Sequence, residues 1–158
     1  MPLHDYIGQF KRSENVKIFY GTNQSNSQRL AEIIDSEFGE GGIDVVIDDA
    51  SHHYPETRAS FATIFARVSP GGCYIIEDWG WAHWPSKHWS TDYFRGRPAV
   101  TNLVAEICAL VAARPDIARD ICVSPEFMVV RRGPAKLAAG FNVSQYFLSQ
   151  GRPIRPFL

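Results

Sequence analysis

The stretch IDVVIDDASHH (43–53) decides the fold of this chain. Residues 43–48 form a nearly continuous apolar run, which is typical of a strand buried on both faces of a sheet. The run ends in two adjacent acids, Asp48 and Asp49, before a loop with two histidines. The sequence therefore predicts a buried strand over 43–48 that carries polar side chains at its carboxyl end.

Helical and strand-like periodicities alternate on both sides of this strand. Apolar residues recur at helical spacing over three segments, at 30–38, 61–68 and 100–111. Short apolar runs predict four further strands, at 16–20, 73–76, 121–124 and 127–132. Strand–helix–strand alternation with short joints predicts an α/β fold. We expect a mostly parallel sheet that ends in a C-terminal antiparallel strand pair.

The composition of the 158 residues is that of one folded domain, because 45% are hydrophobic and 21% are charged. A net charge of −1 provides no basic field for nucleic acid. The apolar runs are far shorter than the roughly 20 residues that span a bilayer, and the first residues resemble no secretory signal. Three widely spaced cysteines indicate a reducing compartment. We expect a cytoplasmic protein with neither a nucleic-acid nor a membrane partner.

A pair of acids lies at the end of each of two strands that we expect to be neighbours. Asp48 and Asp49 stand at the end of the first strand, and Glu77 and Asp78 at the end of the second. Neighbouring strands lie about 5 Å apart, so these carboxylates repel one another unless a cation neutralises them. Oxygen donors around an open site suit Mg²⁺. The alternative, that the acids cap the helices that follow, explains two equivalent pairs less well.

Histidines and tryptophans surround these acids in the sequence. His52 comes three residues after Asp49 and can act there as a metal ligand or as a general base, whereas His53 is interpreted as a bystander. The segment after Asp78 contains Trp79, Trp81, His83, Trp84, His88 and Trp89. This density favours an acceptor pocket or lid and, equally, a hydrophobic flap or subunit contact.

These motifs together resemble a known family. The chain is similar to the metal-dependent, class I S-adenosylmethionine (SAM) O-methyltransferases of the mycinamicin and macrocin type, which act on sugar hydroxyls of macrolides. Cephalosporin-hydroxylase-like proteins are more distant relatives. The similar segments are YGTNQSN (20–26), IDDASHH (47–53), PGG (70–72), IED (76–78) and Trp84-Pro85. The resemblance covers roughly residues 1 to 132 and implies a Rossmann-like methyltransferase sheet.

The resemblance implies a role for each motif residue. Mg²⁺ would be held by Asp49, Glu77 and Asp78. The cofactor SAM would be contacted by Asn23, Gln24 and Asp48, the first two at its adenine and the third near its amino-acid end. His52 would be the general base that takes the proton of the acceptor hydroxyl.

The chain also departs from the pattern of this family. Ala50 replaces a glycine, and Asn23 replaces an acid. The family's glycine-rich loop and ribose-binding acid would lie before residue 1. We therefore expect a fragment of a longer enzyme or a degenerate relative, with weak SAM binding by the chain alone. The expected organisation is a methyltransferase-like domain over 1–134 and a tail over 135–158.

The expected function is Mg²⁺-assisted methyl transfer from SAM to a hydroxyl of a small, sugar-bearing natural product. A metal-dependent hydrolase built on the same acids and His52 is one alternative, although the histidines lack zinc-type spacing. A non-catalytic methyltransferase remnant that acts in assembly with a partner is the other. Self-association into a homo-oligomer is left open.

Overall fold

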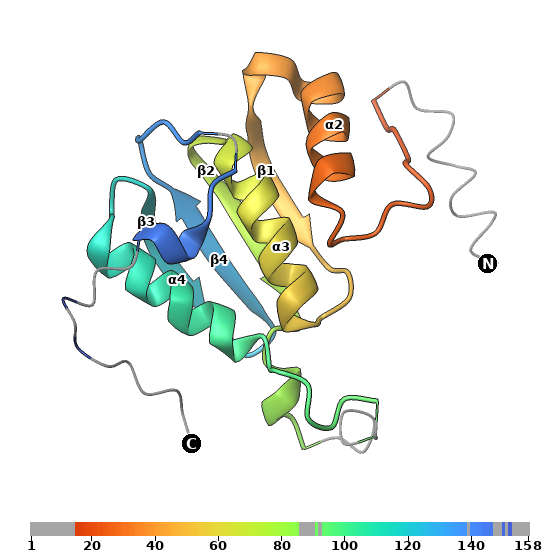
Figure 1. Ribbon diagram of the computed structural model, residues 1–158, viewed down its shortest axis with the longest axis vertical. Helices are drawn as coiled ribbons and strands as arrows, with labels where there is room; N and C mark the ends of the chain where they lie inside the picture. Colours follow the sequence, from red (N-terminus) through yellow and green to blue (C-terminus); the bar gives the residue numbers. More distant parts are fainter. Residues whose placement is uncertain are drawn as a thin grey trace.

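The computed structural model describes residues 15–85, 91, 93–138, 140–146, 150 and 152. Its centre is a four-stranded sheet with the strand order β1-β2-β4-β3 (Figure 1). The strands are β1 (Ile43–Asp48), β2 (Val68–Glu77), β3 (Ala118–Val123) and β4 (Phe127–Arg132). Strands β1 and β2 are parallel, whereas β4 runs antiparallel to both β2 and β3. The predicted α/β fold with its antiparallel strand pair is confirmed.

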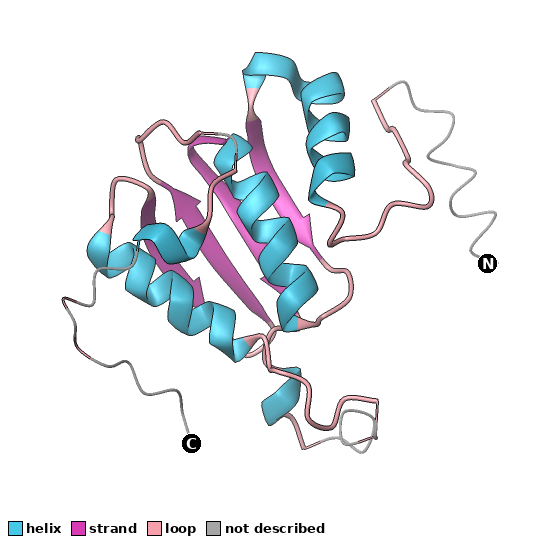
Figure 2. Ribbon diagram, viewed as in Figure 1, coloured by secondary structure: helices cyan, strands magenta, loops and turns pink. Residues whose placement is uncertain are grey.

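Helices cover one face of this sheet. They are α2 (Ser27–Phe38), α3 (Tyr54–Ile64) and α4 (Thr101–Ala113), with short 3-10 turns at Gly39–Gly41, Phe65–Arg67, Trp81–His83 and Val143–Tyr146. Helix α3 connects β1 to β2, and α3 and α4 lie across the face of the sheet that is turned to the viewer in Figure 2. The core between them contains Phe61, Phe65, Tyr74, Ile76, Leu103, Ile107, Met128 and Val130.

One face of β1 is more exposed than predicted. Val45 is 55% exposed and Ile47 is 63% exposed, so the strand is not buried on both faces. Among the described residues, β1 forms an edge of the sheet and pairs only with β2. An apolar run indicates that its side chains favour burial, but it does not indicate whether an element of the structure covers each face.

Two other local predictions were wrong. Residues 16–20 do not form a strand in the structure, and the large apolar side chains among them are at least 37% exposed. Short β-branched runs need a partner strand for their backbone groups, and the described sheet provides none at this position. The strand predicted at 73–76 is longer in the structure, because β2 begins at Val68, and its pairing with β1 jumps from Val68 to Cys73.

The segment after β4 extends the core. Val143 is fully buried and Phe141 is 5% exposed, and both belong to the main hydrophobic cluster. The side chain of Arg132 is buried over the ring of Phe65 and donates to the backbone carbonyls of Ile117 and Gly133. Part of the segment predicted as a tail thus packs against the sheet. Within the described part of the chain, no helix is both long and apolar enough to cross a membrane.

Candidate active site

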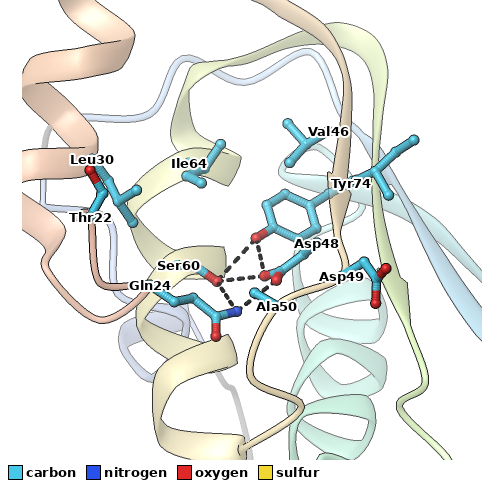
Figure 3. A pocket seen from close by; sticks show the side chains of 11 residues that line it. Thr22, Gln24, Leu30, Val46, Asp48, Asp49, Ala50, Ser60, Ile64 and Tyr74 are labelled. Atoms are coloured by element: carbon cyan, nitrogen blue, oxygen red, sulfur yellow. Dashed lines mark hydrogen bonds between the residues drawn. The ribbon is translucent and has the colours of Figure 1, made fainter. Parts of the chain in front are cut away.

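Four polar side chains meet beneath the carboxyl end of β1. We call this group the inner cluster: Gln24, Asp48, Ser60 and Tyr74 (Figure 3). Asp48 accepts hydrogen bonds from Ser60 Oγ and Tyr74 Oη at Oδ2 and from Gln24 Nε2 at Oδ1, each at 2.6 Å. The residue is only 8% exposed. Burial of this carboxylate is tolerated because three donors satisfy it.

The tyrosine of the inner cluster remains a hydrogen-bond donor. Tyr74 is fully buried, and its ring packs edge-on against Phe61. Burial, with the charge of Asp48, raises the pKa of Tyr74 well above its usual value. Sequence reasoning missed Tyr74 and Ser60 as site residues. A tyrosine within an apolar strand is a usable signal, since a buried hydroxyl needs a partner.

Gln24 joins two loops that carry predicted site residues. Its Oε1 accepts from the backbone nitrogen of Ser51 at 3.1 Å and from Ser51 Oγ at 2.5 Å, while its Nε2 donates to Asp48. The loop before α2 is thereby tied to the loop after β1. Between them lies a pocket of about 290 Å³ that Gln24 and Asp48 both line, together with Thr22, Leu30, Val46, Ile47, Asp49, Ala50, Ser60, Ile64 and Tyr74.

Asn23, the third residue assigned to SAM, shapes the turn that leads into α2. Its Oδ1 accepts from the backbone nitrogen and the hydroxyl of Ser25 at 2.8 and 2.7 Å. Asn23 does not appear among the residues that line the pocket. The helix itself is capped by Asn26, whose Oδ1 accepts from the backbone nitrogen of Arg29. The predicted cofactor residues are therefore close together, and all three use their side chains in hydrogen bonds within the protein.

A second polar group lies just outside the first. We call it the outer cluster: Asp49, His52 and Asp78. One ligand atom of each side chain lies within 4.8 Å of those of the other two. His52 Nε2 is 3.6 Å from Asp49 Oδ1, and the Asp49 side chain is 58% exposed. Figure 3 shows Asp49 pointing away from the hydrogen-bonded group around Asp48. Three of the sequence-predicted site residues thus converge at the ends of two adjacent parallel strands.

The backbone of the outer cluster is unusual. His52 has φ 54° and Asp78 has φ 51°, and both are left-handed conformations that L-residues rarely adopt. Only one other non-glycine residue of the described chain has positive φ. Such conformations persist where the surrounding structure enforces them, and they concentrate at functional sites. Both residues therefore have an orientation that the fold imposes.

Glu77, the other predicted metal ligand, is placed differently from Asp78. It pairs with Phe127 of β4 and belongs to the face of β2 opposite to Ile76. The compact group contains His52 rather than Glu77. Glu77 lies one residue from Asp78 at the same sheet edge, and its role as a ligand stays a prediction.

The tryptophans after β2 divide among several environments. Trp81 is 3% exposed, and its Nε1 donates to the carbonyl of His52 at 2.7 Å. Trp79 packs on the core and donates to the carbonyl of Ser124. His83 is exposed, with Nε2 2.7 Å from Thr101 Oγ1. Trp89 and His88 lie outside the described residues. Trp81 therefore supports the backbone of the outer cluster at His52.

His53 lies inward and outside the outer cluster, and its interpretation as a bystander stays a prediction. It is 7% exposed, and its Nε2 is 3.0 Å from Tyr93 Oη. Burial, with a smaller contribution from the charge of Arg97, lowers the pKa of His53 below its usual value. Neighbouring histidines thus occupy different environments: one belongs to the outer cluster, and the other lies beneath an aromatic segment.

Curated proteins that resemble this chain are O-methyltransferases. It is 53% identical over 45 residues to mycinamicin VI 2''-O-methyltransferase of Micromonospora griseorubida, a match that covers 28% of the chain and 11% of that protein. It is 39% identical over 64 residues to 8-demethyl-8-alpha-L-rhamnosyl tetracenomycin-C 2'-O-methyltransferase of Streptomyces olivaceus, covering 40% of the chain and 16% of the relative. The matches thus span about a tenth to a sixth of the relatives. No protein-family model matches the chain.

Solved structures give the same result over a longer stretch. The fold is similar to that of MycE methyltransferase from the mycinamycin biosynthetic pathway, in complex with Mg, SAH and mycinamycin VI. The TM-score is 0.52 at 29% sequence identity, and the match covers 71% of this chain and 30% of the other. The resemblance predicted from the motifs is confirmed: in sequence and in fold, this chain is similar to O-methyltransferases of the mycinamicin and macrocin type.

Proposed function

We propose that this chain carries the metal- and acceptor-side part of a SAM-dependent O-methyltransferase. The observation that carries the proposal is the outer cluster, in which Asp49, His52 and Asp78 meet at the carboxyl ends of two neighbouring parallel strands. Open α/β sheets bind their ligands at this edge. The similarity to methyltransferases that act on macrolides supports this reaction class.

The side chains of the outer cluster fit a magnesium ion. Two carboxylates supply the oxygen ligands that Mg²⁺ prefers, and the exposure of Asp49 leaves space for bound water. Asp49 and Asp78 would hold the ion, with Glu77 as the further ligand that the family resemblance implies. When bound there, Mg²⁺ would act as a Lewis acid on an acceptor hydroxyl.

The protein's own residues would then do three things. The carboxylates of Asp49 and Asp78 would orient the acceptor oxygen at the sheet edge. His52 would take the hydroxyl proton at Nε2 as the oxygen receives the methyl group, since an imidazole can accept a proton at neutral pH. The inner cluster would hold the loop after β1 in place and, with its pocket, would form one wall of the SAM site.

Calorimetric titration with Mg²⁺ tests the metal site. We expect Asp49→Asn to weaken Mg²⁺ binding by about 100-fold or more, because even outer-shell changes typically cost 10- to 100-fold. Asp35→Asn is the matched control, since its side chain is 60% exposed, close to the 58% of Asp49, and lies on α2 beside Arg67. Equal effects of the two substitutions would remove the basis of the proposal.

The acceptor that we propose is a hydroxyl of a sugar-bearing small molecule, as the names of the relatives suggest. Methyl transfer from radiolabelled SAM to mycinamicin VI in the presence of Mg²⁺ is the direct assay. Product that forms with Mg²⁺ and is lost on chelation supports the proposal. Hydrolysis of the acceptor without methylation would instead support the metal-dependent hydrolase.

A further inference from the structure

His52 adopts a left-handed backbone conformation, and two neighbouring residues, Trp81 and His53, restrain it. On one side, Trp81 Nε1 donates to the carbonyl of His52 itself. On the other side, the next residue, His53, is almost completely buried. Since an L-residue at φ 54° is strained, the contacts around it must hold it there. The packing of Trp81 and His53 therefore holds the backbone from which the His52 imidazole projects.

An aromatic segment joins Trp81 and His53. The rings of Phe94 and Trp81 have centroids 5.0 Å apart, and those of Phe94 and His53 are 5.7 Å apart. Tyr93 stacks edge-on against Phe94, and its hydroxyl lies 3.0 Å from His53 Nε2. Arg97 covers the ring of Tyr93 and donates to its carbonyl. Both sides of His52 thus pack on one continuous aromatic group.

The hydrogen bond between His53 and Tyr93 is the polar link within this group. Tyr93 is 59% exposed, so packing alone does not fix its ring. His53 is the N-cap residue of α3, yet its side chain makes no capping bond. Its Nδ1 is buried and has no hydrogen-bond partner among the described residues. The imidazole is therefore committed to Tyr93 rather than to the helix.

We propose that His53 is a positioning residue: by binding Tyr93 it fixes the aromatic group that holds His52 toward Asp49 and Asp78. This inference rests on the proposed role of His52 as the general base. It assigns a task to the second histidine of the pair and to Tyr93, which no motif indicated.

Three substitutions separate the hydrogen bond from the packing. His53→Leu keeps a side chain of similar bulk but removes both ring nitrogens. His53→Gln keeps an amide that can reach Tyr93 Oη. Tyr93→Phe removes one half-exposed hydroxyl and so leaves the fold intact, which keeps the test valid even if His53→Leu fails to fold.

The first readout needs neither metal nor substrate. It is the exchange rate of the Trp81 indole N–H, measured by NMR, since that proton is bonded to the His52 carbonyl. We expect exchange at least about 10-fold faster in His53→Leu and in Tyr93→Phe and near the wild-type rate in His53→Gln. Wild-type exchange in Tyr93→Phe would overturn the proposal, whether or not the chain binds Mg²⁺.

The second readout distinguishes positioning from a purely structural role. At a temperature where all variants are folded, we expect kcat for methyl transfer to fall about 10-fold in His53→Leu and to recover in His53→Gln. The Mg²⁺ affinity and the KM for SAM should stay within about threefold. Loss of kcat that glutamine does not restore would contradict the role of the hydrogen bond.

Discussion

The inner and outer clusters contain one acid each of an adjacent pair, Asp48 and Asp49, and these two carboxylates have opposite environments. Asp48 is buried and accepts three hydrogen bonds, whereas the side chain of Asp49 is 58% exposed beside His52. The cause is the pleat of β1, because successive side chains of a strand face opposite sides. The comparison shows that one acid of a pair can stabilise the fold while its neighbour remains available to a ligand. Substitutions in the two clusters should therefore affect different quantities.

The largest expected effect is on turnover. In a complete enzyme that contains this segment, His52→Ala should lower kcat by about 10²- to 10⁴-fold, the usual cost of removing a general base. It should also lower the free energy of unfolding by about 1 kcal/mol, because the His52 side chain is only 19% exposed and its packing is lost. The measurement is methyl transfer at saturating SAM, together with Mg²⁺ affinity and urea denaturation. His53→Gln is the control, with kcat near wild type.

The metal affinity of His52→Ala decides the role of that side chain. Unchanged Mg²⁺ binding is the result expected for a base. Complete loss of Mg²⁺ binding would identify His52 as a ligand, which the compact geometry of the outer cluster also permits. The metal-dependent hydrolase would then become the better explanation of the site.

The next effect is on stability. Asp48→Asn should lower the free energy of unfolding by about 2 kcal/mol. The carboxylate accepts three hydrogen bonds with two oxygens, whereas an amide has only one acceptor oxygen. Urea denaturation at pH 7.5 measures the change in stability. Asp49→Asn is the matched neighbour and should change stability by less than about 0.5 kcal/mol. Equal destabilisation by both would mean that the two clusters are not distinct.

The smallest expected effect is the contribution of His53 to the pH dependence of stability. Its pKa is lowered in the folded protein, mainly by burial, so the unfolded chain binds the proton first as the pH falls. The contribution of neutral His53 is thus fully present above about pH 6.5 and is lost as the pH falls below that value. Urea midpoints between pH 7.5 and 5 should fall less steeply in His53→Gln.

The exposed His83 provides the control for this dependence. His83→Gln removes a histidine that contacts Thr101 at the surface and should leave the slope unchanged. A similar flattening by both substitutions would show that the slope does not report burial. A slope unchanged in His53→Gln would contradict the lowered pKa.

Much of the fold followed from local patterns. The strands at 43–48 and 127–132 were predicted with the bounds that the structure has, because β-branched runs between turn residues leave little choice. The helical periodicity at 30–38 ends directly before Gly39, which lies at φ 55° as the C-cap of α2. The segment at 16–20 has the same composition as a strand but lacks a partner in the described sheet. Strand formation depends on distant backbone groups, which a local pattern does not contain.

The sequence by itself placed Asp49, His52 and Asp78 at the ends of two strands, because strand ends and polar residues can be read along the chain. Only the tertiary structure decided that His52 rather than Glu77 joins the two aspartates in the compact group. It also decided that Asp48 turns inward to Ser60 and Tyr74, and that His53 meets Tyr93. These contacts join residues 12 to 40 positions apart. They depend on the strand pleat, on left-handed backbone at two residues and on helix packing, none of which is encoded by spacing alone.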